Sequence, residues 1–555
     1  MKNWFAKILE MESCAAVVFS LRLKTFCFSA KSIKSKIKFS KKITCNIGCG
    51  FAGALLVLFS DFLQAQALSR LPQVKIQEHF MSENILFKNY TSHDYVKFAE
   101  QTANWIKTTG KTGKSGKLWL QSPDSKENFD DYPMLTPKSL YGGSAGVGLF
   151  YLRLYQVTKN PEYLKEAESA AKEIISTYEG KAFYENALSH GTTEDKLVHV
   201  KNMPGWIAGF NNGPTGQAYL TLKLYEVTKE KRYLEFSEKV ADDVISVAKK
   251  ADDGIYWSEQ LDYCGDGSYI PYFAEIYRIT KNEKYVDAAR RFGNYLLTKG
   301  KPAPNGGTFW NVVDLTIIDF PKDVFWVNLA HGTSGVGFVF ALIYNLTKDE
   351  KFLNAAKEAA KYIQGIAVGD ENAVLVPYLD SLERGPSTEF YYLSQCHGPA
   401  GTSLLFHALY DITGEKEYFD WVLKLSRGII KAGAPENFSR GYWQSQALCC
   451  GTPGLLEHFV SVYKLTGEKE FLEYSERTAK TVVGQSFVED ADGDIYHQKN
   501  ARRWSGAWWR TIPTDVYSYT GLYIGTAGNA WTLLSLAAVQ NGEKLIETVE
   551  YDFFK

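Results

Sequence analysis

The chain lacks net charge. Its 555 residues carry 62 Lys and Arg against 63 Asp and Glu, a formal net charge of −1. A balance this even creates no field that attracts polyanions, so we expect no nucleic-acid partner. Hydrophobic residues make up 45% of the chain and charged residues 23%, which is the composition of a folded globular protein and excludes a disordered tail.

The N-terminal residues have the pattern of a secretory signal. A basic stretch over residues 31–42 precedes residues 43–60, which carry no charge, and Ala65-Gln66-Ala67 follows. A basic flank, an apolar core and a small-x-small site predict cleavage after Ala67 and export to the periplasm or the exterior. An uncleaved membrane anchor is the alternative, because eighteen uncharged residues are marginal for a span. A true start at Met81 would instead leave a cytoplasmic protein.

Cysteines are scarce in the body of the chain. Four of the eight precede Ala67, and the remaining four are Cys264, Cys396, Cys449 and Cys450. Four cysteines in a body this long do not form a disulfide scaffold. Cys449 and Cys450 are sequence neighbours, which rarely bond to each other because the ring is strained. These cysteines therefore need another explanation.

A repeat runs through the body. Seven segments begin with a glycine followed by an apolar helix pattern, and six of them continue into a threonine-containing turn and an amphipathic helix pattern. The leading glycines are Gly143, Gly213, Gly265, Gly332, Gly398, Gly451 and Gly525. A first helix that is apolar all round is buried on both sides, whereas the second faces solvent on one side.

Seven such helix pairs predict an all-α fold, an α/α toroid with short β-hairpin loops between the copies. An open solenoid is the alternative, but it needs polar end caps. A helix over about Ser92–Thr108 has no glycine-led partner of its own, so we expect it to pair with the seventh inner helix and close the ring. The predicted organisation is a leader over 1–67, an N-terminal extension over 68–124, the toroid over 125–545 and a tail over 546–555.

The glycine-led turns of a toroid all lie at one end of the ring. Cys396 and Cys449 stand two residues before their glycines, and His331, His397 and Cys450 stand one before theirs. Three sulfur atoms that converge on one rim suit tetrahedral Zn²⁺ with a fourth position open, which is typical of a catalytic zinc. Buried cysteines acting as small hydrophobic residues are the alternative. We interpret Cys264, in the weakest copy, as a packed residue.

Two histidines share the rim with these cysteines. His331 is the candidate general acid/base, because imidazole titrates near neutral pH, although a hydrogen-bonded structural histidine is the alternative. His397 follows Cys396 directly and is a candidate for a fourth zinc ligand, an acid/base or an orienting group. His407 and His458 lie within inner helices and are expected in the core.

The motifs LAHG (329–332), CHGPAG (396–401) and CCGTPG (449–454), together with the seven turns, resemble the lanthionine synthetase C-like proteins over roughly residues 125–545. The resemblance implies that Cys396, Cys449 and Cys450 hold zinc, with Cys450 where most members have histidine. His331 matches the active-site histidine of the family. Asp262 is the nearest counterpart of a family aspartate, but the match is poor, and Ile524 stands where relatives often carry an acid.

The implied activity is addition of a zinc-bound thiol to dehydroalanine or dehydrobutyrine, which forms a lanthionine-type thioether. The partner would be a thiol-containing peptide or a glutathione-like substrate, with a separate dehydratase if the enzyme is a cyclase. A membrane is expected as a partner only through an uncleaved N-terminal segment. A carbohydrate-active toroid, a hydrolase or epimerase with an aromatic groove, is one alternative. The tryptophans that suggest this alternative are Trp257, Trp310, Trp326, Trp443, Trp508 and Trp509. A non-catalytic zinc-binding scaffold is the other.

Overall fold

The computed structural model describes residues 88–123, 137–190, 204–313, 321–388, 391–437, 441–442, 444–488, 499–507 and 516–552. The chain divides into two units, Met1–Glu83 and Asn84–Lys555, and all described residues belong to the second. The expected signal segment and the start at Met81 therefore lie outside the described residues. Along the described part of the chain, no helix combines the length and the apolar character that a membrane crossing requires.

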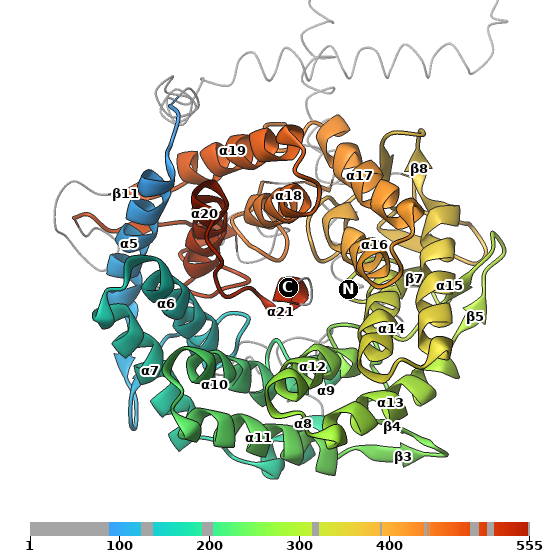
Figure 1. Ribbon diagram of the computed structural model, residues 1–555, viewed down its shortest axis with the longest axis horizontal. Helices are drawn as coiled ribbons and strands as arrows, with labels where there is room; N and C mark the ends of the chain where they lie inside the picture. The colour runs from blue at the N-terminus through green and yellow to red at the C-terminus, as the bar shows by residue number, and fades with distance from the viewer. Residues whose placement is uncertain are drawn as a thin grey trace, which may run out of the picture. The chain divides into compact units, whose positions relative to one another are not determined.

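The second unit is a ring of helix pairs around a central bore (Figure 1). The inner helices are α6 (Ser144–Thr158), α10 (Pro214–Thr228), α12 (Tyr269–Thr280), α14 (Thr333–Thr347), α16 (Pro399–Thr413), α18 (Thr452–Thr466) and α20 (Thr526–Asn541). The outer helices are α7 (Pro161–Ser176), α11 (Lys231–Ser246), α13 (Glu283–Leu297), α15 (Glu350–Ile366), α17 (Lys416–Lys431), α19 (Lys469–Gly484) and α5 (Ser92–Thr109). This is the predicted α/α toroid.

The first and last elements of the ring close it. Helix α5, at the N-terminal end of the described chain, packs along α20, and both contact α6 of the first repeat (Figure 1). The prediction that the unpaired helix near Ser92 completes the seventh pair is confirmed. Two further helices, α8 (Lys181–His190) and α9 (Pro204–Ala208), lie between the first and second repeats.

The helix patterns explain the two layers. In α14 every residue from Thr333 to Ile343 is buried, as expected for a helix with the bore on one side and an outer helix on the other. In α13 the buried residues recur every three or four positions, including Tyr285, Ala289, Phe292 and Leu296, so a single stripe faces the core. The inner layer therefore carries almost no exposed surface along these turns.

Each inner helix ends in the same turn. Thr158 donates its hydroxyl to the Leu154 carbonyl, and Lys159 closes α6 in the left-handed conformation with φ 58°. The corresponding residues in the later repeats are Lys229, Lys281, Lys348, Gly414, Gly467 and Gly542, all with positive φ. The Thr-Lys/Gly pattern of the sequence is thus a helix C-cap, which explains why glycine replaces lysine in three copies.

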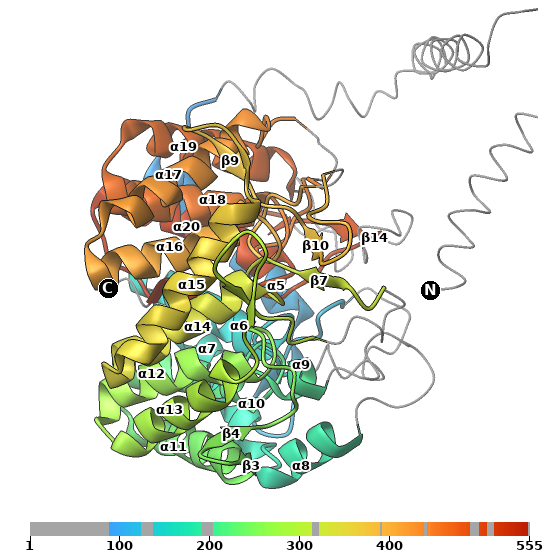
Figure 2. The same ribbon diagram turned by 90° about the vertical axis from the view of Figure 1, so that its right-hand side faces the viewer.

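Short antiparallel hairpins connect the repeats at the end of the ring where the inner helices begin (Figure 2). The strand pairs within single connections are β1 (Lys111–Thr112) with β2 (Lys117–Leu118), β3 (Lys249–Ala251) with β4 (Gly254–Tyr256), β5 (Lys301–Pro302) with β6 (Thr308–Phe309), and β8 (Val368–Gly369) with β9 (Val374–Leu375). The remaining pairs are β7 (Val324–Trp326) with β10 (Leu379–Ser381), β11 (Phe487–Val488) with β12 (Arg502–Arg503), and β13 (Gly506–Ala507) with β14 (Val516–Tyr517).

A tryptophan follows four of these hairpins and joins the two layers. Trp310 donates its indole N–H to the Leu296 carbonyl at the end of α13 and its backbone N–H to the Thr333 hydroxyl at the start of α14. Trp119, Trp257 and Trp504 make the same indole bond to the ends of α5, α11 and α19. Each tryptophan therefore fixes the start of an inner helix relative to the preceding outer helix.

The C-terminal segment lies inside the bore. Leu545, Ile546 and Val549 are buried, and the short helix α21 (Val549–Asp552) lies in the centre of the ring (Figure 1). Glu550 is 2% exposed and accepts hydrogen bonds from the Tyr523 hydroxyl at 2.8 and 3.0 Å. The described part of the predicted tail, residues 546–551, thus packs against the inner wall.

Candidate functional site

A ladder of backbone hydrogen bonds ties the glycine-led turns together. The N–H groups of Cys264, Ala330, Cys396 and Cys449 donate to the carbonyls of Ala330, Cys396, Cys449 and Tyr523 at 2.8–3.1 Å. The ladder continues from Tyr523 to Tyr141 and from Tyr141 to Asn211, at 2.9 Å each. Neighbouring segments joined in this way lie about 5 Å apart. Side chains from repeats distant in sequence therefore meet at the mouth of the bore.

The ladder shows which position of the repeat Cys264 occupies. In the other copies the ladder residue stands two before the leading glycine, whereas Cys264 stands directly before Gly265. The third turn is one residue shorter and opens with a 3₁₀ turn, Asp266–Ser268, before α12. Cys264 thus occupies the position equivalent to Cys396 and Cys449, and no residue of this repeat occupies the position of His331. Its sulfur packs against the same cluster as those of the other three cysteines.

The three predicted zinc ligands lie in one cluster, in which Cys449 and Cys450 pack against Cys396. Cys449 interacts electrostatically with Cys396, Cys450 and the Tyr141 hydroxyl. Burial raises the pKa of Cys396, and the neighbouring thiols together with burial raise the pKa values of Cys449 and Cys450 well above the usual range. Without a cation, these sulfurs therefore remain protonated thiols at neutral pH.

The three thiols are of the kind that binds soft divalent metals, and they belong to one cluster. Three thiols from two adjacent turns share one buried cluster, and a bound cation would relieve the cost of ionising them there. Among the described residues, however, no three His, Cys, Asp or Glu side chains are already arranged to hold a metal ion.

His331 is held by a buried carboxylate. Its Nδ1 lies 3.1 Å from Oδ2 of Asp262, which is 1% exposed, and Oδ1 of Asp262 accepts the Gly265 N–H at 2.6 Å. A carboxylate accepts hydrogen bonds, so Nδ1 carries the proton and Nε2 is left free to exchange one. The sequence identified Asp262 as a poor match, because the shortened third turn hides its position. One sequence feature could have pointed to Asp262. It is an acidic residue just before the third repeat, and that repeat has no histidine directly before its leading glycine.

His397 packs beside His331 within an aromatic wall. The two imidazole centroids are 5.6 Å apart, and Trp326 lies 4.8 Å from His331 and 5.7 Å from His397. Tyr378 and Tyr392 meet His397 edge-on at 5.1 and 5.8 Å. Burial, and then the nearby His331, hold the pKa of His397 well below its usual range, so its ring is neutral. Its Nδ1 has no hydrogen-bond partner among the described residues.

The structure divides the tryptophans of the proposed carbohydrate groove. Trp257 and Trp310 are buried and connect the two helix layers. Of the tryptophans predicted for the groove and described by the structure, Trp326 alone lies at the histidines. Trp443, Trp508 and Trp509 lie outside the described residues. Sequence reasoning missed Trp206, whose ring meets His331 at 5.9 Å, and Tyr378, because neither occupies a position that the repeat defines.

Comparisons with known proteins agree with this architecture. The profile of the family described as "Lanthionine synthetase C-like protein" matches residues 135–547. Among solved structures, a nisin cyclase is similar with a TM-score of 0.53 and 15% identity, over 77% of this chain and 94% of that one. A cellobiose 2-epimerase from Bacillus thermoamylovorans aligns with a TM-score of 0.38 and 12% identity, over 81% of this chain and 99% of that one.

No curated protein sequence matches the chain significantly. The likeness to nisin cyclase is a likeness of fold, because the identity is low. The family profile runs from the first glycine-led turn to the segment that enters the bore, and so covers all seven inner helices. The chain therefore belongs to the lanthionine synthetase C-like family.

Proposed function

We propose that this protein forms thioethers by adding a substrate thiol to the β-carbon of a dehydroalanine or dehydrobutyrine residue. The observation that carries the proposal is the cluster of Cys396, Cys449 and Cys450 thiols beside the His331–Asp262 pair, at one mouth of the toroid. Thiolate chemistry and proton transfer are the two requirements of this reaction, and the site brings both kinds of group together.

Cys396, Cys449 and Cys450 are the proposed ligands of a Zn²⁺ ion. When bound, the ion supplies Lewis acidity that lowers the pKa of a substrate thiol, so that it reacts as a thiolate at neutral pH. The backbone ladder holds the ligands at adjacent positions, since the Cys396 N–H donates directly to the Cys449 carbonyl at 3.1 Å. Tyr141, two turns further along the ladder, interacts with Cys449 and helps to restrain that side chain.

His331 is the proposed proton carrier. Addition of sulfur to the β-carbon leaves an electron pair on the α-carbon and its carbonyl, and that carbanion must receive a proton. Asp262 binds Nδ1–H of His331, so Nε2 is the atom that delivers or takes up this proton. His397 remains neutral in its buried setting and, with Trp326, excludes water from the space beside His331.

The substrate class follows from this chemistry. A thiol-containing peptide with a dehydrated residue would be cyclised, and a glutathione-like thiol would be joined to a separate dehydrated residue. We propose that the dehydrated residue is supplied by a separate dehydratase. Export after cleavage near Ala67 remains our proposal for location. N-terminal sequencing of the mature protein tests it directly.

Thioether formation is tested with a synthetic dehydroalanine peptide and a thiol, the product being detected by mass spectrometry. We expect product with the wild-type protein and a loss of at least about 100-fold with Cys396→Ala, the size of a general acid–base or nucleophile contribution. Cys264→Ala is the matched control, because Cys264 has the same ladder position in a repeat outside the proposed ligand set.

Equal rates for wild type and Cys396→Ala would end the catalytic proposal. Zinc retained by a variant that makes no product would favour a binding scaffold instead. Release of reducing sugar from oligosaccharides, unaffected by Cys396→Ala, would favour the carbohydrate-active alternative.

A further inference from the structure

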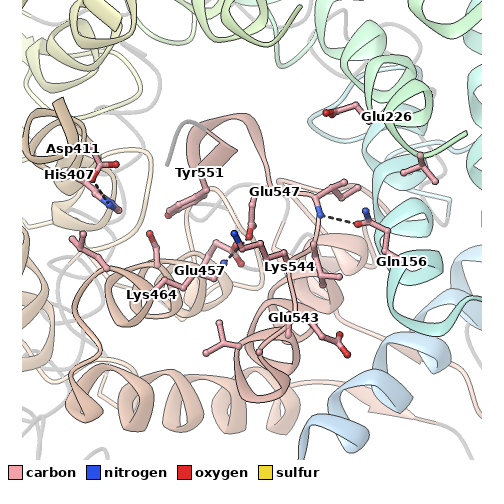
Figure 3. A pocket seen from close by; sticks show the side chains of 18 residues that line it. Gln156, Glu226, His407, Asp411, Glu457, Lys464, Glu543, Lys544, Glu547 and Tyr551 are labelled. Atoms are coloured by element: carbon pink, nitrogen blue, oxygen red, sulfur yellow. Dashed lines mark hydrogen bonds and ion pairs between the residues drawn. The ribbon is translucent and has the colours of Figure 1, made fainter. Parts of the chain in front are cut away.

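A cavity lies at the opposite mouth of the ring from the cysteines. Its volume is about 800 Å³, and it is lined by parts of α6, α10, α16, α18 and α20 and by residues 542–547 and 551 (Figure 3). Lys464 lies thirteen residues beyond Gly451 along α18, which is about 20 Å of helix from the glycine-led turn. The cavity is therefore separate from the thiol cluster, and the buried C-terminal segment lies between them.

Some charged groups of this cavity are already paired. Glu547 binds Lys464 at 2.7 Å and lies 3.6 Å from buried Arg153. Glu226 binds Lys223 at 2.9 Å and also pairs with Arg278. These pairs leave little net charge on that part of the wall. The other charged side chains of the lining are Asp411, Glu457, Glu543 and Lys544, so the remaining charged groups are acidic on balance.

Asp411 is one of the acidic groups without such a pair. No lysine or arginine pairs with it among the described residues, and its nearest charged-type neighbour is His407, whose Nε2 lies 3.9 Å from Oδ1. Burial lowers the pKa of His407 to about 3, so this imidazole is neutral and does not compensate the carboxylate. Burial also raises the pKa of Asp411 to about 6, which is the expected effect of a carboxylate that lacks a cation.

Hydrogen-bonding capacity also remains unused elsewhere in the cavity. Tyr551 is 7% exposed, its hydroxyl has no hydrogen-bond partner among the described residues, and its ring points from α21 into the cavity (Figure 3). A buried hydroxyl without a partner is unfavourable, so a ligand that bonded to it would be stabilised. Glu457, 2% exposed, lines the same wall and has a single hydrogen-bonded partner, Ser535 at 2.7 Å.

The rest of the wall is aliphatic. Val227, Leu465, Ala538, Val539, Leu545 and Ile546 line the cavity between its polar groups. A ligand that fits must therefore combine a hydrogen-bond donor of positive charge with a hydrocarbon part.

We propose that this cavity binds an aliphatic amine, with the ammonium group at Asp411 and the hydrocarbon chain along the aliphatic wall. An ammonium group has three donors and no acceptor, which matches a carboxylate and the neutral imidazole beside it. The site stands apart from the thiol cluster, and its occupation does not depend on the proposed thioether chemistry.

The test is calorimetric titration of the full chain with hexylamine, and with hexanol and hexanoate as probes of equal length. We expect saturable binding of hexylamine alone, weakened at least about ten-fold by Asp411→Asn, because each ten-fold in affinity corresponds to 1.4 kcal/mol, within the range for a charge-assisted hydrogen bond. Asp420→Asn is the matched control, because that aspartate pairs with Lys416 on the exposed face of α17. Unchanged urea midpoints for both variants would show that they remain folded.

Two sets of results would overturn the proposal. The first is equal binding of hexanol or hexanoate, absence of saturable hexylamine binding, or an Asp411→Asn variant that binds as wild type does. The second is hexylamine binding that Asp420→Asn weakens as much as Asp411→Asn does. Neither result bears on thioether formation, which is assayed separately with a thiol and a dehydroalanine peptide.

Discussion

Asp262→Asn is the substitution that tests the proposed proton carrier most directly. Each oxygen of the native carboxylate accepts one N–H group, Gly265 N–H at 2.6 Å and His331 Nδ1–H at 3.1 Å. Asparagine has the same shape but a single acceptor oxygen. The backbone N–H of Gly265 is fixed and at the shorter distance, so the amide oxygen takes that bond and the NH₂ group faces His331.

The expected consequence is an inverted imidazole. Nδ1 of His331 would become an acceptor and Nε2 would hold the remaining proton, which is the wrong tautomer for taking up a proton at Nε2. Loss of a positioned acid–base typically costs 10²–10⁴ in rate, so we expect kcat to fall at least about 100-fold. Binding of the peptide does not involve this proton, so KM should change less than about three-fold.

The assay has two readouts. Product formation from a dehydroalanine peptide and a thiol gives kcat and KM, and ¹⁵N chemical shifts of labelled histidine report which ring nitrogen carries the proton. Asp243→Asn is the matched control, because that buried carboxylate accepts from Tyr178 and Lys239 on the outer layer, away from the histidines. A variant with kcat within about five-fold of wild type, or with an unchanged tautomer, would refute the reasoning.

Three further outcomes are expected. Wild-type protein should hold one zinc per chain by elemental analysis, and Cys449→Ala, which removes the central thiol of the cluster, should lose it; zinc kept in that variant would exclude the proposed ligand set. Burial lowers the pKa of His458 to about 3, so its contribution to stability is complete above pH 6.5 and is lost as the pH falls from there toward 3. Between pH 7.5 and 5.5, urea unfolding should therefore show wild type losing about 1.4 kcal/mol more than His458→Gln, and equal losses would contradict this. Glu550→Ala leaves the buried Tyr523 hydroxyl without its acceptor and should cost about 1–3 kcal/mol in the same assay, whereas a change below about 0.5 kcal/mol would show that α21 does not support the ring.

Much of the fold could be predicted because each copy of the repeat is defined by residues that lie close together in the sequence. Each copy has a glycine at the start of a buried helix, a Thr-Lys/Gly turn and an amphipathic helix, and these depend on residues a few positions apart. The positions before Gly332, Gly398 and Gly451 follow from the same periodicity. The meeting of His331, Cys396 and Cys449 at one mouth was therefore predictable.

Other features depend on residues that no periodicity relates. The third turn is shorter by one residue, and only its backbone bond to Ala330 reveals that Cys264 has the ladder position and that Asp262 reaches His331. Trp326 stands at the histidines because β7 pairs with β10, and not because of its place in a repeat.

The sequence alone determined the ring, its number of helix pairs and the rim residues, because burial periodicity and turn chemistry act over short stretches of chain. Only the tertiary structure decided which groups became partners across the ring. The thiols lie in one cluster, the C-terminal segment enters the bore through Glu550, and Asp411 remains without a cation. These outcomes depend on three-dimensional distances between segments far apart in the chain, and such distances leave no regular spacing in the sequence.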